Sequence, residues 1–100
     1  GEPLTAAIAE KGRVEVQNGN GISGSAASVA ERLRGGGWEV AGTTNSGRED
    51  YATTVVVARA RNLPQAEAVA AFLGFGQVEQ GAVPRGTDVL VIVGADAVGS

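Results

Sequence analysis

The chain has 100 residues, the size of one small domain, and carries a net charge of −3. It contains no cysteine, histidine or methionine, which removes the usual metal ligands and the commonest acid–base and thiol chemistry. The seven arginines are scattered along the sequence, which argues against a nucleic-acid partner. No apolar run approaches the roughly 18 residues of a membrane span. We therefore expect no metal, no cofactor and no nucleic acid.

Residues 1–12 are predicted to be a linker or tail, and residues 13–97 to form the globular domain. Valine alternates with polar side chains over residues 14–17, which predicts a half-buried strand. Two Asn-Gly dipeptides at 18–21 then predict a tight turn, because asparagine and glycine tolerate positive φ. Since the first residue is Gly1 and not methionine, we expect the chain to be part of a longer protein.

The next stretch has the spacing of an amphipathic helix over residues 25–34, with Ser23 as its expected N-cap. Three glycines at 35–37 are expected to end this helix. Alternation predicts a second strand at residues 38–42, and a polar loop follows over residues 43–52.

Residues 53–58 are rich in β-branched side chains and predict a third strand. A second helix should follow, with Asn62 as its N-cap and Pro64 in its first turn. Gly74 is expected to end that helix. Residues 77–80 are a further candidate strand.

After Asp88 an unbroken apolar run reaches Val93, which is typical of a central strand covered on both faces. The resulting order is β-α-β-β-α-β-β. This order predicts an α/β (α+β) sandwich with a mixed sheet and two helices on one face, in the ferredoxin-like, split β-α-β arrangement.

Gly19, Gly21 and Gly24 have the spacing of a G-x-G-x-x-G phosphate turn, and the N–H groups at a helix N-terminus attract phosphate. Nucleotide or phosphorylated-ligand binding at residues 19–24 is therefore one hypothesis. A dinucleotide fold also needs a carboxylate at the end of its second strand, whereas Glu39 lies inside the predicted strand. We favour the other interpretation, a tight turn that lets helix and sheet approach closely.

Arg48, Glu49, Asp50 and Tyr51 cluster in the predicted loop. An acid–base pair is conceivable there, but we favour the simpler interpretation, a solvated loop of charged residues. Without histidine a serine triad is excluded. We expect no catalytic residues in this chain and no enzymatic activity.

Four segments, taken in order, resemble the LytR C-terminal domain family over residues 13–96. They are Val14-x-Val16-x-Asn18-Gly19-x-Gly21-x-x-Gly24, the aromatic strand start Trp38-Glu39-Val40, Asp50-Tyr51-x-x-Thr54-Val55-Val56, and the closing run from Asp88 to Gly94-Ala95-Asp96.

This resemblance implies an extracytoplasmic accessory domain of a bacterial cell-envelope protein. Such domains often follow a LytR-CpsA-Psr catalytic domain, which attaches glycopolymers to peptidoglycan, and others follow a membrane helix. The catalytic residues of that domain have no counterparts here, so its transferase activity is not carried over. Contact with a membrane is expected only through an anchor elsewhere in the parent protein.

The resemblance makes a non-catalytic domain that contacts cell-wall glycan (peptidoglycan or a glycopolymer) or an envelope protein our first hypothesis. By analogy of fold with the peptidoglycan-binding SPOR domains, the ligand would lie on the uncovered sheet face. Trp38 and Tyr51 would be the rings for a sugar, with Asn18, Arg48 and Asp50 as further candidate ligand-binding residues. The low aromatic content also keeps a protein partner open.

Overall fold

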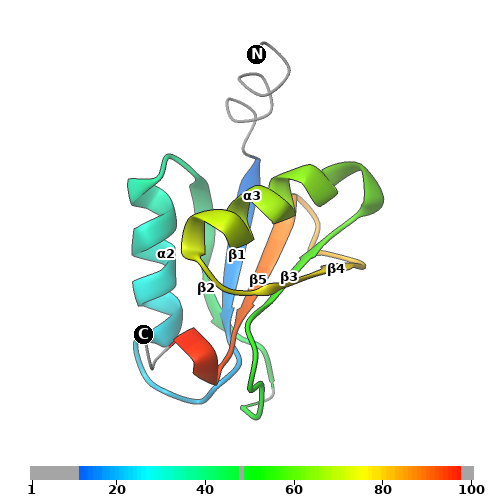
Figure 1. The fold of residues 1–100 in the computed structure, drawn as a ribbon. Coiled ribbons are helices and arrows are strands. Elements are labelled where there is room, and N and C mark those ends of the chain that lie inside the picture. Colours follow the sequence, from blue (N-terminus) through cyan, green and yellow to red (C-terminus); the bar gives the residue numbers. More distant parts are fainter. Residues whose placement is uncertain (1–11, 48, 98–100) are drawn as a thin grey trace.

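The computed structural model describes residues 12–47 and 49–97 (Figure 1). Of the predicted tail at residues 1–12, all but Gly12 lies outside the described residues. The described helices and strands, in chain order, are β1 (Arg13–Asn18), α2 (Ser25–Gly35), β2 (Glu39–Asn45), β3 (Val55–Ala58), α3 (Leu63–Leu73), β4 (Gln77–Gln80) and β5 (Val89–Val93), with short 3₁₀ segments at Ala60–Asn62 and Ala95–Ala97. None of these helices is long and apolar enough to cross a membrane.

The strands form one mixed sheet in the order β2-β1-β5-β3-β4. β1 is parallel to β2 and to β5, β3 is parallel to β4, and β3 runs antiparallel to β5. The predicted class, an α/β sandwich with a mixed sheet, is confirmed. The strand order differs from the split arrangement, because β1 lies directly beside β2 and β3 directly beside β4. The apolar β5 lies in the centre, between the β1-α2-β2 unit and the β3-α3-β4 unit. No local sequence pattern determines which strands become neighbours.

Helices α2 and α3 cover the same face of the sheet, as predicted (Figure 1). Alternate side chains of the three inner strands point toward the helices and form a single core. Its buried members are Val14, Val16, Val56, Ala58, Val89, Val91 and Val93 from the strands, Ala26, Val29, Ala30 and Leu33 from α2, and Ala66, Val69 and Leu73 from α3, together with Trp38. The core is thin because alanine and valine dominate it.

Several element boundaries are where the sequence predicts them. Asn62 occupies the N-cap position of α3, although its side chain makes no capping hydrogen bond. Pro64 lies in the first turn, and Gly74 follows the last residue in a left-handed conformation, with a φ of 85°. The candidate strand β4 forms and pairs with β3. β2 extends to Asn45, beyond the predicted end, because each of its last residues still has a partner on β1.

The start of α2 differs from prediction. Its N-cap is Gly24, with a φ of 88°, and no side chain caps the helix, so the assignment of Ser23 as N-cap is wrong. The left-handed conformation at Gly24 turns the chain sharply into the helix, and Ser23 lies outside the position from which a hydroxyl caps. The first turn of α2 therefore begins without a side-chain cap.

β5 lies in the centre of the sheet, as predicted, and both described helices pack on one of its faces. Val89, Val91 and Val93 point into the core, whereas Leu90 and Ile92 point to the other side, where no described helix packs. The prediction that both faces are covered is met in part, because Leu90 is buried and Ile92 is half-buried.

Candidate functional site

The turn after β1 is held by the side chain of Asn18. Its Oδ1 accepts hydrogen bonds from the backbone N–H groups of Asn20 and Gly21, each at 3.0 Å. Its Nδ2 donates to the carbonyl oxygen of Ile22 at 2.8 Å. Asn18 thus acts as a brace inside the turn, and these bonds occupy both ends of its amide.

Four backbone N–H groups of the predicted phosphate turn are already used. Gly19 N–H donates to the carbonyl of Val93 at 2.9 Å, and Ile22 N–H donates to Asn20 Oδ1 at 2.8 Å. All four N–H groups from residue 19 to residue 22 therefore have acceptors within the protein. A Cβ placed on Gly21 would lie 3.1 Å from Glu49 Oε1, so a carboxylate also stands beside the turn. This geometry disfavours an anion.

The carboxylate that a dinucleotide fold would use is at the wrong end of the sheet. Glu39 is the first residue of β2 and stands opposite Arg13, with 3.8 Å between Arg13 Nε and Glu39 Oε2. The residue at the carboxyl end of β2, beside the turn, is Asn45. The ribose-binding feature of a dinucleotide site is thus missing from its usual place.

The third and fourth family segments meet through Thr54 and Asp96. Thr54 is fully buried, and its N–H donates to both carboxylate oxygens of Asp96, at 2.9 and 3.0 Å. Its hydroxyl donates to Asp96 Oδ1 at 2.7 Å and accepts the N–H of Gly94 at 2.9 Å. These bonds join the start of β3 to the end of β5, so Thr54 and Asp96 are structural residues.

The glycine turn joins the same cluster. Asn20 Nδ2 donates to the carbonyl of Gly94 at 2.9 Å, and Tyr51 N–H donates to the carbonyl of Gly19 at 3.0 Å. Ala95 N–H in turn donates to the carbonyl of Tyr51 at 2.8 Å. We call the three segments that meet here, residues 18–24, 51–54 and 94–96, the motif end of the sheet.

The two rings predicted to hold a sugar lie in different places. Trp38 is only 7% exposed and packs against Phe72 with ring centroids 4.9 Å apart, so its role in ligand stacking is not supported and its place is in the core. Tyr51 is half-buried, and a Cβ on Gly19 would lie 2.8 Å from both the Tyr51 ring and Ile92. Tyr51 therefore lies at the end of the uncovered sheet face.

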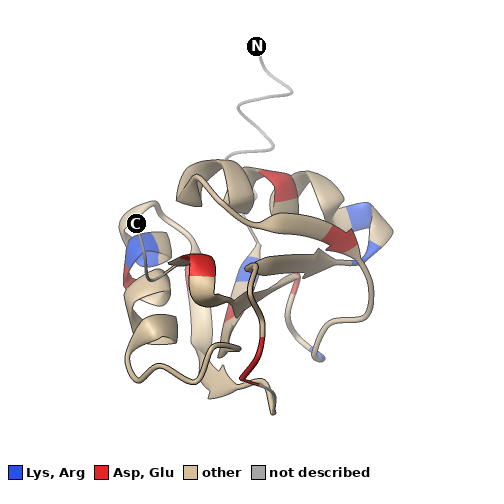
Figure 2. Ribbon diagram, turned by 60° about the horizontal axis from the view of Figure 1, so that its bottom comes forward, with Lys and Arg blue, Asp and Glu red and all other residues tan. Residues whose placement is uncertain are grey.

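The remaining predicted ligand residues do not form one site with these rings. Asn18 braces the turn, Asp50 is exposed in the loop before β3, and Arg48 lies outside the described residues. In the view of Figure 2, basic and acidic residues are interspersed along the described ribbon. No three His, Cys, Asp or Glu side chains of the described ranges come together as metal ligands would.

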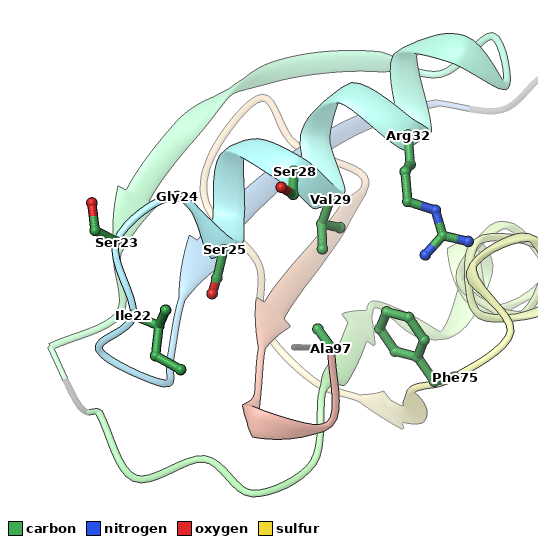
Figure 3. Close-up of a pocket in the computed structure, with 9 residues that line it drawn as sticks. All are labelled: Ile22, Ser23, Gly24, Ser25, Ser28, Val29, Arg32, Phe75 and Ala97. Atoms are coloured by element: carbon green, nitrogen blue, oxygen red, sulfur yellow. The ribbon is translucent and has the colours of Figure 1, made fainter. Parts of the chain in front are cut away.

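A groove of about 350 Å³ runs along α2 from its first turn (Figure 3). Ser25, Val29 and Arg32 project from the helix, and Phe75 and Ala97 face them from the other side (Figure 3). The complete lining is Ile22, Ser23, Gly24, Ser25, Ser28, Val29, Arg32, Phe75 and Ala97. The groove thus combines hydroxyl groups, apolar side chains, one aromatic ring and one cation.

Arg32 and Phe75 are positioned together at one end of this groove. The Arg32 guanidinium carbon lies 5.8 Å from the centre of the Phe75 ring, and Arg32 Nη2 donates to the carbonyl of Leu73 at 3.1 Å. Arg32 lies within the predicted amphipathic helix, and nothing in the sequence connects it with Phe75. The sequence offered one hint that Phe75 is near the surface of the helix layer, namely its position directly after Gly74, which ends α3.

A second groove, of about 270 Å³, lies on the other side of the α2 N-terminus, against the carboxyl end of β2. It shares Ser23 and Gly24 with the first groove. Its lining is Asn18, Ser23, Gly24, Ala26, Ala27, Thr43, Thr44 and Asn45, which brings amide and hydroxyl groups but no charged side chain. Hydroxyl-rich ligands match these groups, because each hydroxyl both donates and accepts hydrogen bonds.

The fold and the two grooves define a small α/β domain with polar surface grooves at one end of its sheet. The sequence model of the LytR C-terminal domain, described as LytR cell envelope-related transcriptional attenuator, matches residues 11–96. The chain therefore belongs to the LytR C-terminal domain family, an accessory-domain family associated with cell-envelope proteins.

The chain is also similar to a protein domain of known structure. The chain is similar to the solution structure of the C-terminal domain of RV0431, with 30% sequence identity and a TM-score of 0.51. The similarity covers 84% of this chain and 72% of that chain. Among curated proteins, none matches the chain significantly.

Proposed function

We propose that this chain is a non-catalytic accessory domain that binds cell-wall glycan in the grooves beside the N-terminus of α2. The family association with cell-envelope proteins supports this setting. The domain would act outside the cytoplasm, held near the membrane by other parts of its parent protein. Its task would be to keep that protein in contact with the wall polymer.

The main observation behind this proposal is the groove shown in Figure 3. Its half-buried Phe75 ring offers an apolar wall, while Ser25 and Ser28 provide hydroxyl groups on the helix opposite (Figure 3). Ligand sites generally combine apolar walls with a few polar groups that fix orientation. A sugar ring has both an apolar face and a rim of hydroxyls, so it suits this pairing.

Arg32 adds a preference for acidic glycan. Its guanidinium can form paired hydrogen bonds with a carboxylate, and Arg32 is exposed to solvent at the groove. Peptidoglycan carries free carboxylates on its stem peptides. We therefore favour fragments that retain a carboxylate over neutral sugars.

Trp38 is predicted to stack on a sugar, but it is buried in the core. In this proposal Phe75 is the ring that contacts the sugar. The phosphate hypothesis for Gly19, Gly21 and Gly24 is less favoured, since the N–H groups of residues 19–22 are already bonded. It nevertheless predicts a distinct response to nucleotides, which the same experiment measures.

The test is an NMR titration of the backbone amides with soluble peptidoglycan fragments, with NAD and ATP in parallel. We expect shifts for residues that line the two grooves, with glycan alone. Arg32→Gln should weaken binding about tenfold, since a charge-assisted hydrogen bond is lost. Ser28→Trp should abolish binding by filling the groove.

Arg34→Gln is the matched control, because Arg34 is also exposed on α2 but does not line either groove. It should change the affinity by less than about twofold. Equal losses from Arg32→Gln and Arg34→Gln would reject the groove as the site. Shifts at residues 19–24 with NAD or ATP, and none with glycan, would replace our proposal with the nucleotide hypothesis.

A further inference from the structure

The sheet face opposite the helices has a regular pattern in two neighbouring rows. In both rows, two apolar residues of β5 and β3 lie between polar residues of β1 and β4. The first row is Glu15–Leu90–Val57–Glu79, and the second is Gln17–Ile92–Val55–Gln77. We call these eight residues the open face.

The centre of the open face is apolar and partly accessible. Val55, Val57 and Ile92 are half-buried, and Leu90 is 8% exposed although it lies outside the helix-covered core. An unbroken apolar strand such as β5 is typical of a sheet with both faces covered. Both described helices pack on the opposite face, so a partner here would complete the burial of Val55, Val57 and Ile92.

The flanks of the apolar centre are acidic. Glu15 and Glu79 end the same row, three strand spacings or about 14 Å apart. The Glu15 carboxylate accepts a hydrogen bond from Gln17 Nε2 at 3.2 Å, which leaves its charge in place.

Two arginines lie outside the two rows: Arg13 is the first residue of β1, and Arg59 directly follows β3. Arg13 pairs with Glu39 at 3.8 Å. Arg59 donates to the carbonyl of Thr87 at 3.2 Å. The eight residues of the open face therefore include two carboxylates and no cation.

We infer that the open face is a docking surface for an amphipathic helix of another protein, with Lys or Arg on both sides of its apolar stripe. A helix is about 10–12 Å across, which fits between acidic flanks about 14 Å apart. Its apolar stripe packs on Val55, Val57 and Ile92, and its cations reach Glu15 and Glu79. Charge complementarity of this kind selects the partner.

The same charges disfavour the other occupants of an apolar face. A second copy of this chain would place acidic flanks against acidic flanks, and an anionic membrane surface would repel them. This docking surface is also separate from the grooves beside α2, so the inference does not depend on glycan binding.

Two helical peptides of about 18 residues test the inference. One has a leucine stripe flanked by lysines, and the other has the same stripe flanked by glutamates. Titrated into the isotope-labelled chain, the lysine peptide should shift amides of β3 and β5. The glutamate peptide should bind about tenfold more weakly or worse, because two attractions become repulsions.

Glu15→Gln with Glu79→Gln should bring the two affinities to within about twofold of each other. The matched control is Glu31→Gln with Glu67→Gln, which removes two exposed carboxylates from the helices and should preserve the tenfold difference. Equal binding of the two peptides, absence of binding, or shifts centred on the helices would overturn the inference. Self-association of the chain through this face in analytical ultracentrifugation would overturn it as well.

Discussion

The motif end and the open face use their polar side chains in opposite ways. At the motif end, Asn18, Thr54 and Asp96 direct their polar groups to neighbouring backbone and side-chain partners. On the open face, Glu15 and Glu79 flank an apolar surface and remain accessible to a partner. The polar residues at the motif end therefore build the scaffold, whereas the side chains of the open face are available to a partner.

This contrast explains why a phosphate-like glycine pattern can be misleading. The pattern reports backbone geometry, and that geometry also serves a turn braced by side-chain amides. A site for a ligand needs polar groups that are still available. Substitutions at the motif end should therefore cost stability, and substitutions on the open face should cost binding.

Gly94→Ala should have the largest effect. A Cβ at this position would lie 2.5 Å from the carbonyl carbon of Thr53, and backbone atoms cannot yield as a flexible side chain can. We expect a loss of about 3 kcal/mol or more in the free energy of unfolding, measured by urea denaturation. Gly35→Ala, where nothing lies within 4 Å, should change it by less than about 1 kcal/mol. A similar stability for both variants would contradict the close approach.

Thr54→Val should have the next largest effect. The change keeps the shape but removes the hydroxyl that bonds Asp96 and Gly94, and it leaves the buried Gly94 N–H without its acceptor. A loss of about 2–3 kcal/mol is expected in the same denaturation experiment. Thr53→Val, at an exposed neighbour, is the control and should stay within about 0.5 kcal/mol. If both variants unfold at the same urea concentration, the hydroxyl is not structural.

Asn18→Ala should have a moderate effect of about 1–2 kcal/mol, since it removes the brace from a partly exposed turn. Amide hydrogen exchange should accelerate at Asn20 and Gly21, whose N–H groups lose their acceptor. Asn45→Ala serves as the comparison, because Asn45 is exposed at the paired end of β2. Unchanged exchange at Asn20 would mean that the turn holds its shape without Asn18.

Glu15→Gln combined with Glu79→Gln should have the smallest effect on folding, within about 0.5 kcal/mol, because both substitutions keep the shape of surface side chains. The same pair should strongly reduce discrimination between the lysine and glutamate peptides. A large loss of stability in thermal unfolding would show that these carboxylates belong to the scaffold, and would remove the contrast between the two regions.

Much of the fold was predictable because it depends on patterns over a few residues. Alternation located the strands, Pro64 and Gly74 marked the second helix, and the apolar run after Asp88 pointed to the sheet centre. The candidate site was much less predictable. Trp38 looked available for a ligand until Phe72, from a distant helix, was seen to cover it.

The sequence by itself determined the local elements, the α/β class and the family, since these follow from backbone preferences, side-chain periodicity and short motifs. Tertiary structure alone decided the strand order, the pairing of Thr54 with Asp96 across 42 residues, and the meeting of Arg32 with Phe75. It also left the apolar side chains of β5 and β3 on an open face. These features depend on how the whole chain packs, because contacts between distant segments form only when the entire core is assembled.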